Sequence, residues 1–258
     1  AKSGARDKAS TQRANMVAAF ASGGSDPDDV DLGDFDRDFD LDLFVNLHEG
    51  KSLLWSNDGT GKFNDVTGNV PAFGAAFHYD PAVCDVDADG DLDLWVDNVA
   101  SGYTEMLLIN DGTGKFTNET AARVSDNVIQ ADDNGVACVD VDHDGDFDAA
   151  VMSLTDNERV LLNDGTGKFD NVGGFPTQDD PTLWFDFGDL NGDGRLDCVT
   201  GQGESQPRIN RVYLGASTAV VDNRPPKIIA TQLIGAGASA IVRFAVSDGA
   251  VTDDGPRL

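Results

Sequence analysis

Short apolar runs alternate with dense polar stretches through most of this chain. Runs such as Leu43-Phe44-Val45, Leu94-Trp95-Val96 and Met106-Leu107-Leu108-Ile109 are three or four residues long and lie between segments rich in Asp, Asn and Gly. Apolar runs of this length, bounded by turn-forming residues, are typical of β-strands and too short for amphipathic helices. The pattern therefore predicts an all-β protein made of many short strands.

Two polar motifs repeat in phase with these runs. A stretch of alternating carboxylates begins at Asp34, Asp85, Asp140 and Asp189, so that successive copies are 51, 55 and 49 residues apart. The second motif, NDGTGKF, occupies residues 57–63, 110–116 and 163–169, with a degenerate fourth copy at 213–216. A period of about 50 residues is characteristic of repeat architectures in which each repeat is one supersecondary unit.

The NDGTGKF motif predicts a β-hairpin in each unit. An Asp-Gly pair between two apolar runs favours a tight turn, because the turn requires positive φ angles. Phe63, Phe116 and Phe169 close the motif and are expected to begin the return strand with their rings packed inward. Each unit then contains about four antiparallel strands, as a propeller blade does. We expect a propeller-like array of about four blades, with five as the alternative.

The chain divides into three parts on this basis. Residues 1–25 are expected to form an N-terminal arm that is flexible or supplies one strand, and residues 26–219 the repeats. Residues 220–258 lack both motifs and predict a C-terminal β extension, with strands over Lys227–Leu233 and Ala240–Val246. This extension could complete a blade, form a partial immunoglobulin-like segment or pair with another subunit. A closed ring of four or five blades and an open array remain alternatives.

The acidic stretches are the candidate metal sites. Within each nine-residue loop, positions one, three, five and nine are Asp, except for Asn191 in the fourth loop. Position seven is Asp in three loops but Arg195 in the fourth, and an arginine side chain does not bind a cation, so we expect this position to contribute its backbone carbonyl. The expected ligands are Asp34, Asp36, Asp38, Asp40 and Asp42; Asp85, Asp87, Asp89, Asp91 and Asp93; Asp140, Asp142, Asp144, Asp146 and Asp148; and Asp189, Asn191, Asp193, Arg195 and Asp197, with Asp40, Asp91, Asp146 and Arg195 binding through the carbonyl.

Oxygen ligands in this number favour calcium, with about four ions per chain in a structural role. Position nine is expected to bind in bidentate fashion. An EF-hand is excluded because position twelve, which is Glu in that motif, is Val45, Val96, Val151 or Thr200 here. Position six is glycine in three loops but Phe39 in the first, so we expect the first site to be the weaker one.

Charge and composition restrict the partners. The net charge is −28, from 46 acidic and 18 basic residues, which argues against binding to nucleic acid or to an anionic membrane surface. The sequence contains no apolar run long enough for insertion into a membrane and no signal peptide. Cys84, Cys138 and Cys198 are expected to be small buried hydrophobic residues, with one disulfide as the alternative.

No catalytic constellation emerges from the remaining residues, and we expect a protein that is not an enzyme. The three histidines, His48, His78 and His143, are not paired with a nucleophile by any motif, and His143 is expected to be solvated. Trp95 is expected in the core. Core positions are also favoured for Trp55 and Trp184, with a carbohydrate-stacking surface as the alternative.

The combination of DxDxDGDxD loops and NDGTGKF hairpins resembles the FG-GAP/VCBS repeat family, which forms the calcium-binding blades of integrin α-subunit heads. The resemblance covers about Val30 to Leu214. It implies a β-propeller with calcium in a hairpin at the edge of each blade, a secreted or cell-surface location, and a role in adhesion or scaffolding. The implied partner is a protein or glycan ligand on a cell surface or matrix.

Two alternatives follow from the departures from this family. The family usually closes a ring of seven blades, whereas four units are recognisable here, so a self-assembling subunit of an extracellular filament or surface layer, and thus a homo-oligomer, is one alternative. A carbohydrate-binding, lectin-like propeller is the other.

Overall fold

The computed structural model describes residues 27–47, 52–72, 78–99, 104–127, 131–175, 181–203, 208–216, 227–234 and 241–247. The predicted N-terminal arm, residues 1–25, lies outside these ranges. Within them, the helical elements are a single 3-10 turn, η1 (Thr67–Asn69), and a one-turn helix, α2 (Thr120–Arg123). No helix in the described ranges is long and apolar enough to cross a membrane.

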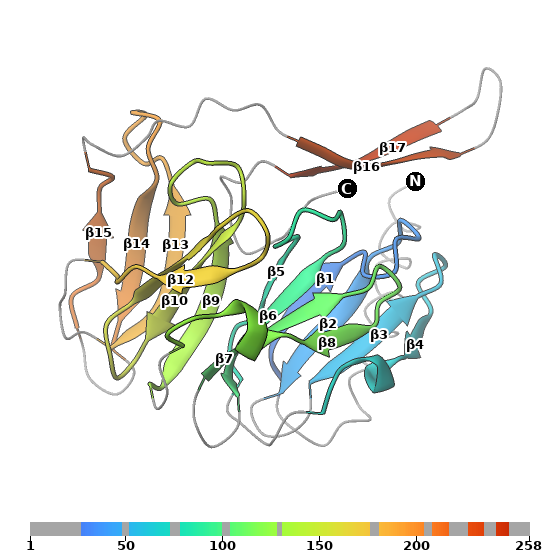
Figure 1. The fold of residues 1–258 in the computed structure, drawn as a ribbon, viewed down its shortest axis with the longest axis horizontal. Helices are drawn as coiled ribbons and strands as arrows, with labels where there is room; N and C mark the ends of the chain where they lie inside the picture. The colour runs from blue at the N-terminus through green and yellow to red at the C-terminus, as the bar shows by residue number, and fades with distance from the viewer. Residues whose placement is uncertain are drawn as a thin grey trace, which may run out of the picture.

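The strands form consecutive antiparallel sheets, and we call the first four of them blades 1 to 4 (Figure 1). Blade 1 contains β1 (Pro27–Gly33), β2 (Asp42–Leu47), β3 (Leu53–Asn57) and β4 (Phe63–Asp65). Blade 2 contains β5 (Ala82–Cys84), β6 (Asp93–Val99), β7 (Thr104–Asn110) and β8 (Phe116–Asn118). Blade 3 contains β9 (Asp133–Val139), β10 (Asp148–Ser153), β11 (Arg159–Asn163) and β12 (Phe169–Asn171). Blade 4 contains β13 (Thr182–Gly188), β14 (Asp197–Gln202) and β15 (Arg211–Tyr213).

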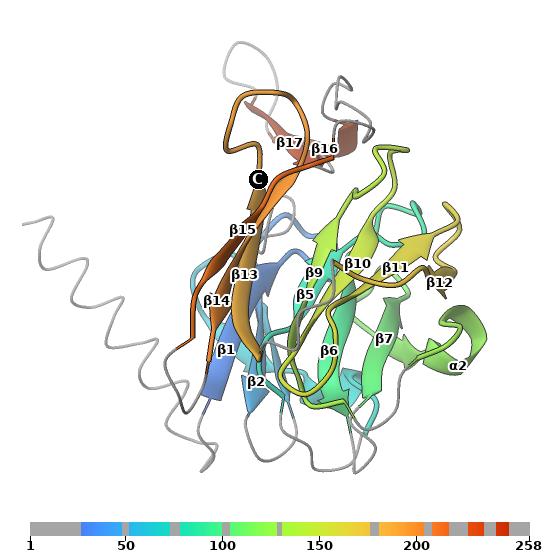
Figure 2. The ribbon, with the colours of Figure 1, turned by 90° about the vertical axis from the view of Figure 1, so that its left-hand side faces the viewer.

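The predicted all-β, propeller-like array of four blades is confirmed, with one correction. In the part of the chain that the structure describes, blade 4 has three strands instead of four. The reason lies in the degenerate motif at the end of β15, where Gly215 stands in place of the hairpin asparagine and no DGTGKF turn follows. Lys227–Ile234 (β16) and Ile241–Ser247 (β17) pair with each other in a separate two-stranded sheet, which lies beyond one end of the blades (Figures 1 and 2).

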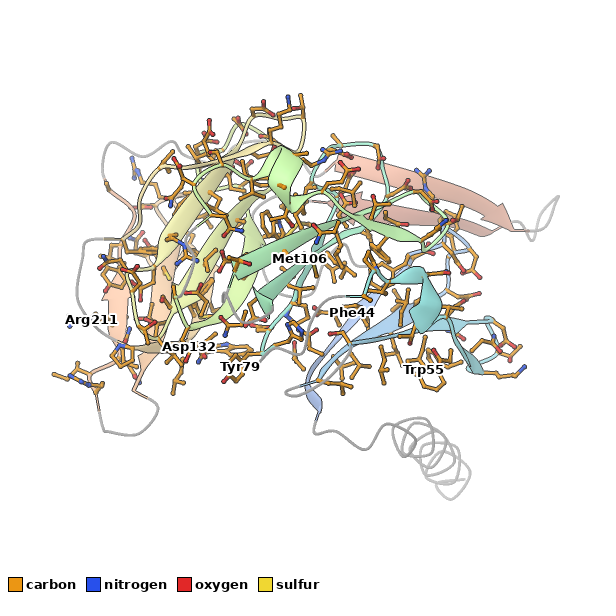
Figure 3. All side chains as sticks on the ribbon, turned by 60° about the horizontal axis from the view of Figure 1, so that its bottom comes forward. Phe44, Trp55, Tyr79, Met106, Asp132 and Arg211 are labelled. Carbon is orange, nitrogen blue, oxygen red and sulfur yellow. A yellow bond between two sulfur atoms is a disulfide. The ribbon has the colours of Figure 1, made fainter. Side chains whose placement is uncertain are left out.

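The hydrophobic core lies between the blades. Phe44 and Met106, both labelled in Figure 3, belong to a cluster of buried side chains that joins blades 1 and 2. A second cluster joins blades 2 and 3, where the ring of Trp95 meets that of Phe169 edge-on at 4.9 Å. A third joins blades 3 and 4. Each blade is thus stabilised mainly by its neighbours, as expected for stacked repeats.

The aromatic predictions hold in part. Trp95 is fully buried, as predicted, and Phe116 and Phe169 pack inward at the start of their return strands. Phe63 also begins a strand but is only half-buried. Trp184 is 49% exposed, which contradicts the favoured core position, because it lies on the face of blade 4 that has no following blade.

All three cysteines are buried, as predicted, and for two of them the alternative of a disulfide applies. Cys84 and Cys138 form a disulfide whose Cα atoms are 6.3 Å apart, whereas Cys198 is a buried free thiol. The pairing is between β5 and β9, the first strands of blades 2 and 3, which contact each other. Residues next to consecutive acidic loops therefore face one another across the blade interface.

Candidate metal centres

Each acidic loop joins the first strand of a blade to the second. In blade 1, β1 ends at Gly33 and β2 begins at Asp42, so position one follows one strand and position nine begins the next. The loop turns back through left-handed residues at positions four and six. Position six has φ values of 69° at Phe39, 91° at Gly90, 102° at Gly145 and 78° at Gly194. Phe39 thus adopts the conformation that glycine adopts in the other loops, at a steric cost.

Positions one, three and nine converge in the first three loops. In each of them the three carboxylates place one oxygen apiece within 4.8 Å of one another. The groups are Asp34, Asp36 and Asp42; Asp85, Asp87 and Asp93; and Asp140, Asp142 and Asp148. The loop sequence therefore brings together the predicted ligands at these positions. Position five lies outside the groups, and there Asp38, Asp89 and Asp144 accept a hydrogen bond from the amide of position seven.

Backbone amides hold these carboxylates in place. The position-six amide donates to position one at 3.0 Å in each of the first three loops and at 2.8 Å in the fourth. The position-two amide donates to Oδ2 of position nine at 2.9 to 3.1 Å in all four loops. The remaining lone pairs of the converging carboxylates are left for another positive group.

Burial makes these groups costly as bare anions. It raises the pKa of Asp34 to about 6 and that of Asp42 to about 7, and neighbouring carboxylates add to the effect. Burial likewise raises the pKa of Asp93 to about 8 and that of Asp148 to about 7. Oδ1 of Asp34 is buried and accepts no hydrogen bond. A hard divalent cation fits this donor set, because it neutralises clustered carboxylates and prefers oxygen ligands.

Sequence reasoning missed the part that the hairpin asparagine plays in these loops. The amides of Asn57, Asn110 and Asn163 donate to Oδ1 of position nine at 2.8, 2.9 and 2.8 Å. Their Nδ2 atoms donate to the carbonyl of position eight at 3.2, 3.0 and 2.9 Å. The NDGTGKF motif therefore supports the acidic loop as well as turning the chain. The constant phase between the two motifs was the signal for this role.

The fourth loop differs from the others. Asp189 is exposed, and hydrogen bonds from the amides of Gly194 and its neighbours lower its pKa. Position three is the neutral Asn191, and the guanidinium of Arg195 pairs with Asp193 at 3.2 Å. No group of three converging carboxylates forms in this loop. It thus carries less uncompensated negative charge than the first three.

Two arginines reach the second loop from outside it. Nε of Arg37, at position four of the first loop, lies 2.7 Å from Oδ1 of Asp91. Arg123, in α2, pairs with Asp87 at 3.1 Å. The pKa of Asp87 is still raised, mainly by burial and secondarily by Asp89, so these cations offset only part of the negative charge.

The histidines lie outside the carboxylate groups or outside the described residues. His78 is fully buried, with Nδ1 2.8 Å from the carbonyl of Asp97, and burial lowers its pKa. His143 is 6% exposed, so the prediction of a solvated side chain is wrong. Burial raises the pKa of the nearby Asp140, and His143 offsets part of that rise. His48 lies outside the described residues.

Comparisons with known proteins agree with this geometry. Residues 34–96 and 140–200 match the FG-GAP-like repeat. These two segments of the chain belong to this repeat family. Each match begins at position one of an acidic loop and continues into the second strand of the next blade. The predicted resemblance to FG-GAP/VCBS repeats is therefore confirmed.

No curated protein matches this FG-GAP chain. Among solved structures, BBS1N, crystallised in complex with ARL6DN, is 16% identical, with a TM-score of 0.40 over 87% of this chain and 64% of that one. The biofilm matrix protein Bap1 of V. cholerae is also 16% identical, with a TM-score of 0.32 over 69% of this chain and 29% of that one. The chain thus spans less than two thirds of either protein.

Proposed function

We propose that this FG-GAP chain is an extracellular binding or scaffold module whose blades are stabilised by calcium, and that it is not an enzyme. The observation that carries the proposal is the recurrence of one group of three converging carboxylates, with position nine buried, at the same place in three consecutive blades. Recurrence in three of the four blades favours a role in the architecture, because catalytic and ligand sites are few per protein. Free energy of calcium binding then contributes to folding.

The proposed ion joins two strands of its blade. Position one follows the first strand, position nine begins the second, and the hairpin asparagine ties position nine to the third strand. Positions one, three and nine supply carboxylates that already converge. Position five and the carbonyl of position seven complete the ligand set that the sequence predicts. About four ions are expected, and the fourth loop should need the highest calcium concentration because of its Asn191 and Arg195.

Thermal unfolding tests this role directly. We expect the melting temperature to fall when calcium is removed with EGTA and to recover when calcium is added back. At a calcium concentration a hundredfold above its Kd, one site contributes about 2.7 kcal/mol to the free energy of unfolding. Several sites together should therefore shift the melting temperature strongly. Magnesium serves as the control, because it fits such loops poorly. An identical melting curve in calcium and in EGTA would rule out the structural role.

Two further observations support an extracellular module. The Cys84–Cys138 disulfide is of a kind that persists in oxidising compartments. The exposed indole of Trp184 could stack on a sugar ring, which favours the glycan class among the expected ligands on a cell surface or matrix. A glycan array with the wild-type chain and the Trp184→Ala variant tests this part. Binding that is unaffected by the substitution excludes the Trp184 surface and points to a protein ligand or another glycan site.

The two ends of the array favour self-assembly as a second candidate function. Val30 and Leu32 of blade 1 are 38% and 48% exposed, yet the same positions in blades 2 to 4 face the preceding blade. Blade 4 exposes Trp184, Val199 and Val212 on its opposite face. Blade 1 of a second copy could cover this face, which gives a head-to-tail contact and a ring or filament. Light scattering in calcium tests this, and a strict monomer at high concentration contradicts it.

A further inference from the structure

We infer that the asparagine of the second and of the third NDGTGKF hairpin couples the calcium site of its own blade to that of the preceding blade, so that loops 1 to 3 fill cooperatively while loop 4 fills independently. This inference rests on the proposed calcium binding. It concerns Asn110 and Asn163, which the sequence suggested only as turn residues. The coupling follows from hydrogen bonds that cross the blade interfaces.

Asn110 joins blade 2 to blade 1. Its backbone amide donates to Oδ1 of Asp93, position nine of loop 2, at 2.9 Å. Its Nδ2 donates at 2.8 Å to the carbonyl of Phe35, position two of loop 1. The amide of Phe35 in turn donates to Oδ2 of Asp42, position nine of loop 1, at 3.1 Å. Asn110 and the backbone of one residue, Phe35, thus connect the position-nine carboxylates of two neighbouring loops.

Asn163 repeats the arrangement between blades 3 and 2. Its amide donates to Asp148 at 2.8 Å, and its Nδ2 donates to the carbonyl of Val86 at 2.7 Å. The amide of Val86 donates to Oδ2 of Asp93 at 3.0 Å. Because Asp93 belongs to both arrangements, the hydrogen bonds run without interruption from loop 3 through loop 2 to loop 1 (the corresponding blades are adjacent in Figure 1).

The second glycine of each hairpin packs against the same neighbouring loop. A Cβ atom on Gly114 would lie 3.6 Å from Cβ of Asp36, and one on Gly167 would lie 2.8 Å from Cβ of Asp87. Both glycines therefore approach position three of the preceding loop. The equivalent Gly61 lies in blade 1, the first blade of the described residues, and has nothing within 4 Å. The hairpin thus fits the preceding calcium loop in shape as well as in hydrogen bonding.

Blade 1 and blade 4 lack the connection. Asn57 makes the same bonds within its own blade, to Asp42 and to the carbonyl of Leu41, but among the described residues it has no bond to another blade. In blade 4, the amide of Gly215 still donates to Asp197 at 2.8 Å, but glycine has no side chain to reach blade 3. Asn57 therefore provides a natural control, and loop 4 an internal reference.

Loading of one loop favours loading of the next for a physical reason. Ligation fixes the position-nine carboxylate, which orients the asparagine that bonds to it. The oriented Nδ2 then holds the position-two peptide of the preceding loop, whose amide positions that loop's own position-nine carboxylate. When a second ion binds to this preceding loop, the loop is already ordered, so its loss of conformational entropy on binding is smaller.

The test follows calcium loading separately at each loop. The position-six amides of Phe39, Gly90, Gly145 and Gly194 each bond to a position-one carboxylate, so their NMR signals report one loop apiece during a calcium titration of the full chain. In Asn110→Ala we expect the half-loading calcium concentration to rise for loop 2 and also for loop 1, by about fivefold, the lower end of typical coupling. In Asn57→Ala the half-loading concentration should rise mainly for loop 1, with a smaller rise for loop 2 through the coupling that Asn110 still provides, because coupling is reciprocal.

The outcomes separate this inference from the calcium proposal. A shift confined to loop 2 in Asn110→Ala overturns the coupling. If loops 1 to 3 of the wild type load at unrelated calcium concentrations, the coupling is overturned but calcium binding stands. If none of the four amide signals changes with calcium, the proposed function itself is refuted. If Asn110→Ala does not fold, Asn163→Ala poses the same question for loops 3 and 2, with loop 4 expected to be unchanged in either variant.

Discussion

The first three acidic loops and the fourth share a sequence pattern but differ in electrostatics. Loops 1 to 3 each gather three carboxylates, of which the position-nine group is buried in every loop, and burial raises the pKa of these position-nine groups to about 7 or 8. Loop 4 has an amide at position three, an arginine at position seven and an exposed Asp189 whose pKa is lowered. Loops that share the motif therefore need not bind a cation with equal affinity.

The difference arises from the surroundings of each loop. Loops 1 and 2 are covered by the hairpin of the following blade, whose asparagine and second glycine pack on them. Loop 3 is followed by blade 4, whose hairpin is degenerate, and no blade follows loop 4 in the described part of the chain. Burial by a neighbour makes the carboxylates costly as anions, and that cost is what a bound ion relieves.

The largest effect is expected at the disulfide, which lies beside the buried loops 2 and 3. Replacing both Cys84 and Cys138 with Ala should lower the free energy of unfolding by about 4 kcal/mol, the chain-entropy value for a separation of 54 residues. Cys198→Ala, beside loop 4, removes only one sulfur atom and should cost about 1 kcal/mol. Denaturant unfolding in calcium measures both. Equal losses would mean that the disulfide does not tie blades 2 and 3 together.

Removing position one should separate loop 3 from loop 4. Asp140 and Asp189 are both aspartates at this position, but the first is buried and the second exposed. We expect Asp140→Ala to lower the free energy of unfolding in calcium by about 3 kcal/mol, the contribution of a well-loaded site, and Asp189→Ala by less than about 1 kcal/mol. Calorimetry with and without calcium distinguishes them. Equal losses would contradict the proposed difference between the loops.

The melting temperature of the calcium-free protein should depend on pH because of the buried position-nine carboxylates. The folded-state pKa of Asp42 and Asp148 is about 7 and that of Asp93 about 8, above the ordinary aspartate value, so the folded protein binds more protons than the unfolded one. Their stabilising contribution is present below the ordinary value and is lost as pH rises through 7 to 8. The calcium-free protein should therefore melt at a lower temperature at pH 8 than at pH 5.

Calcium should offset this dependence of the melting temperature on pH. Protons compete with calcium for the same carboxylates, so the increase in melting temperature on adding calcium should be larger at pH 8 than at pH 5. The control is a variant of loop 4, Asp197→Asn, which should retain most of this dependence because loops 1 to 3 are intact. A calcium increment that is the same at both pH values would indicate that the buried carboxylates are not the ligands.

Sequence alone predicted what is local and missed what crosses between blades. The loops, the hairpins and the repeat follow from spacing because strand and turn signals act within about ten residues. The bond from Asn110 to Phe35 spans 75 residues, and no local pattern distinguishes Asn110 from Asn57. The pairing of Cys84 with Cys138 and the exposure of Trp184 likewise depend on which blades are neighbours. Such features become visible only when the blades are placed side by side.

The smallest effect concerns Phe39, which separates loop 1 from loops 2 and 3. Its φ of 69° is a conformation that glycine adopts without steric cost and other residues do not. Phe39→Ala removes the ring but keeps the Cβ atom, whereas Phe39→Gly removes both. We expect Phe39→Gly to be about 1 kcal/mol more stable than Phe39→Ala and to bind calcium more tightly at loop 1. If the two variants unfold and bind alike, the left-handed backbone at position six does not weaken the first site, and its carboxylates alone decide its affinity.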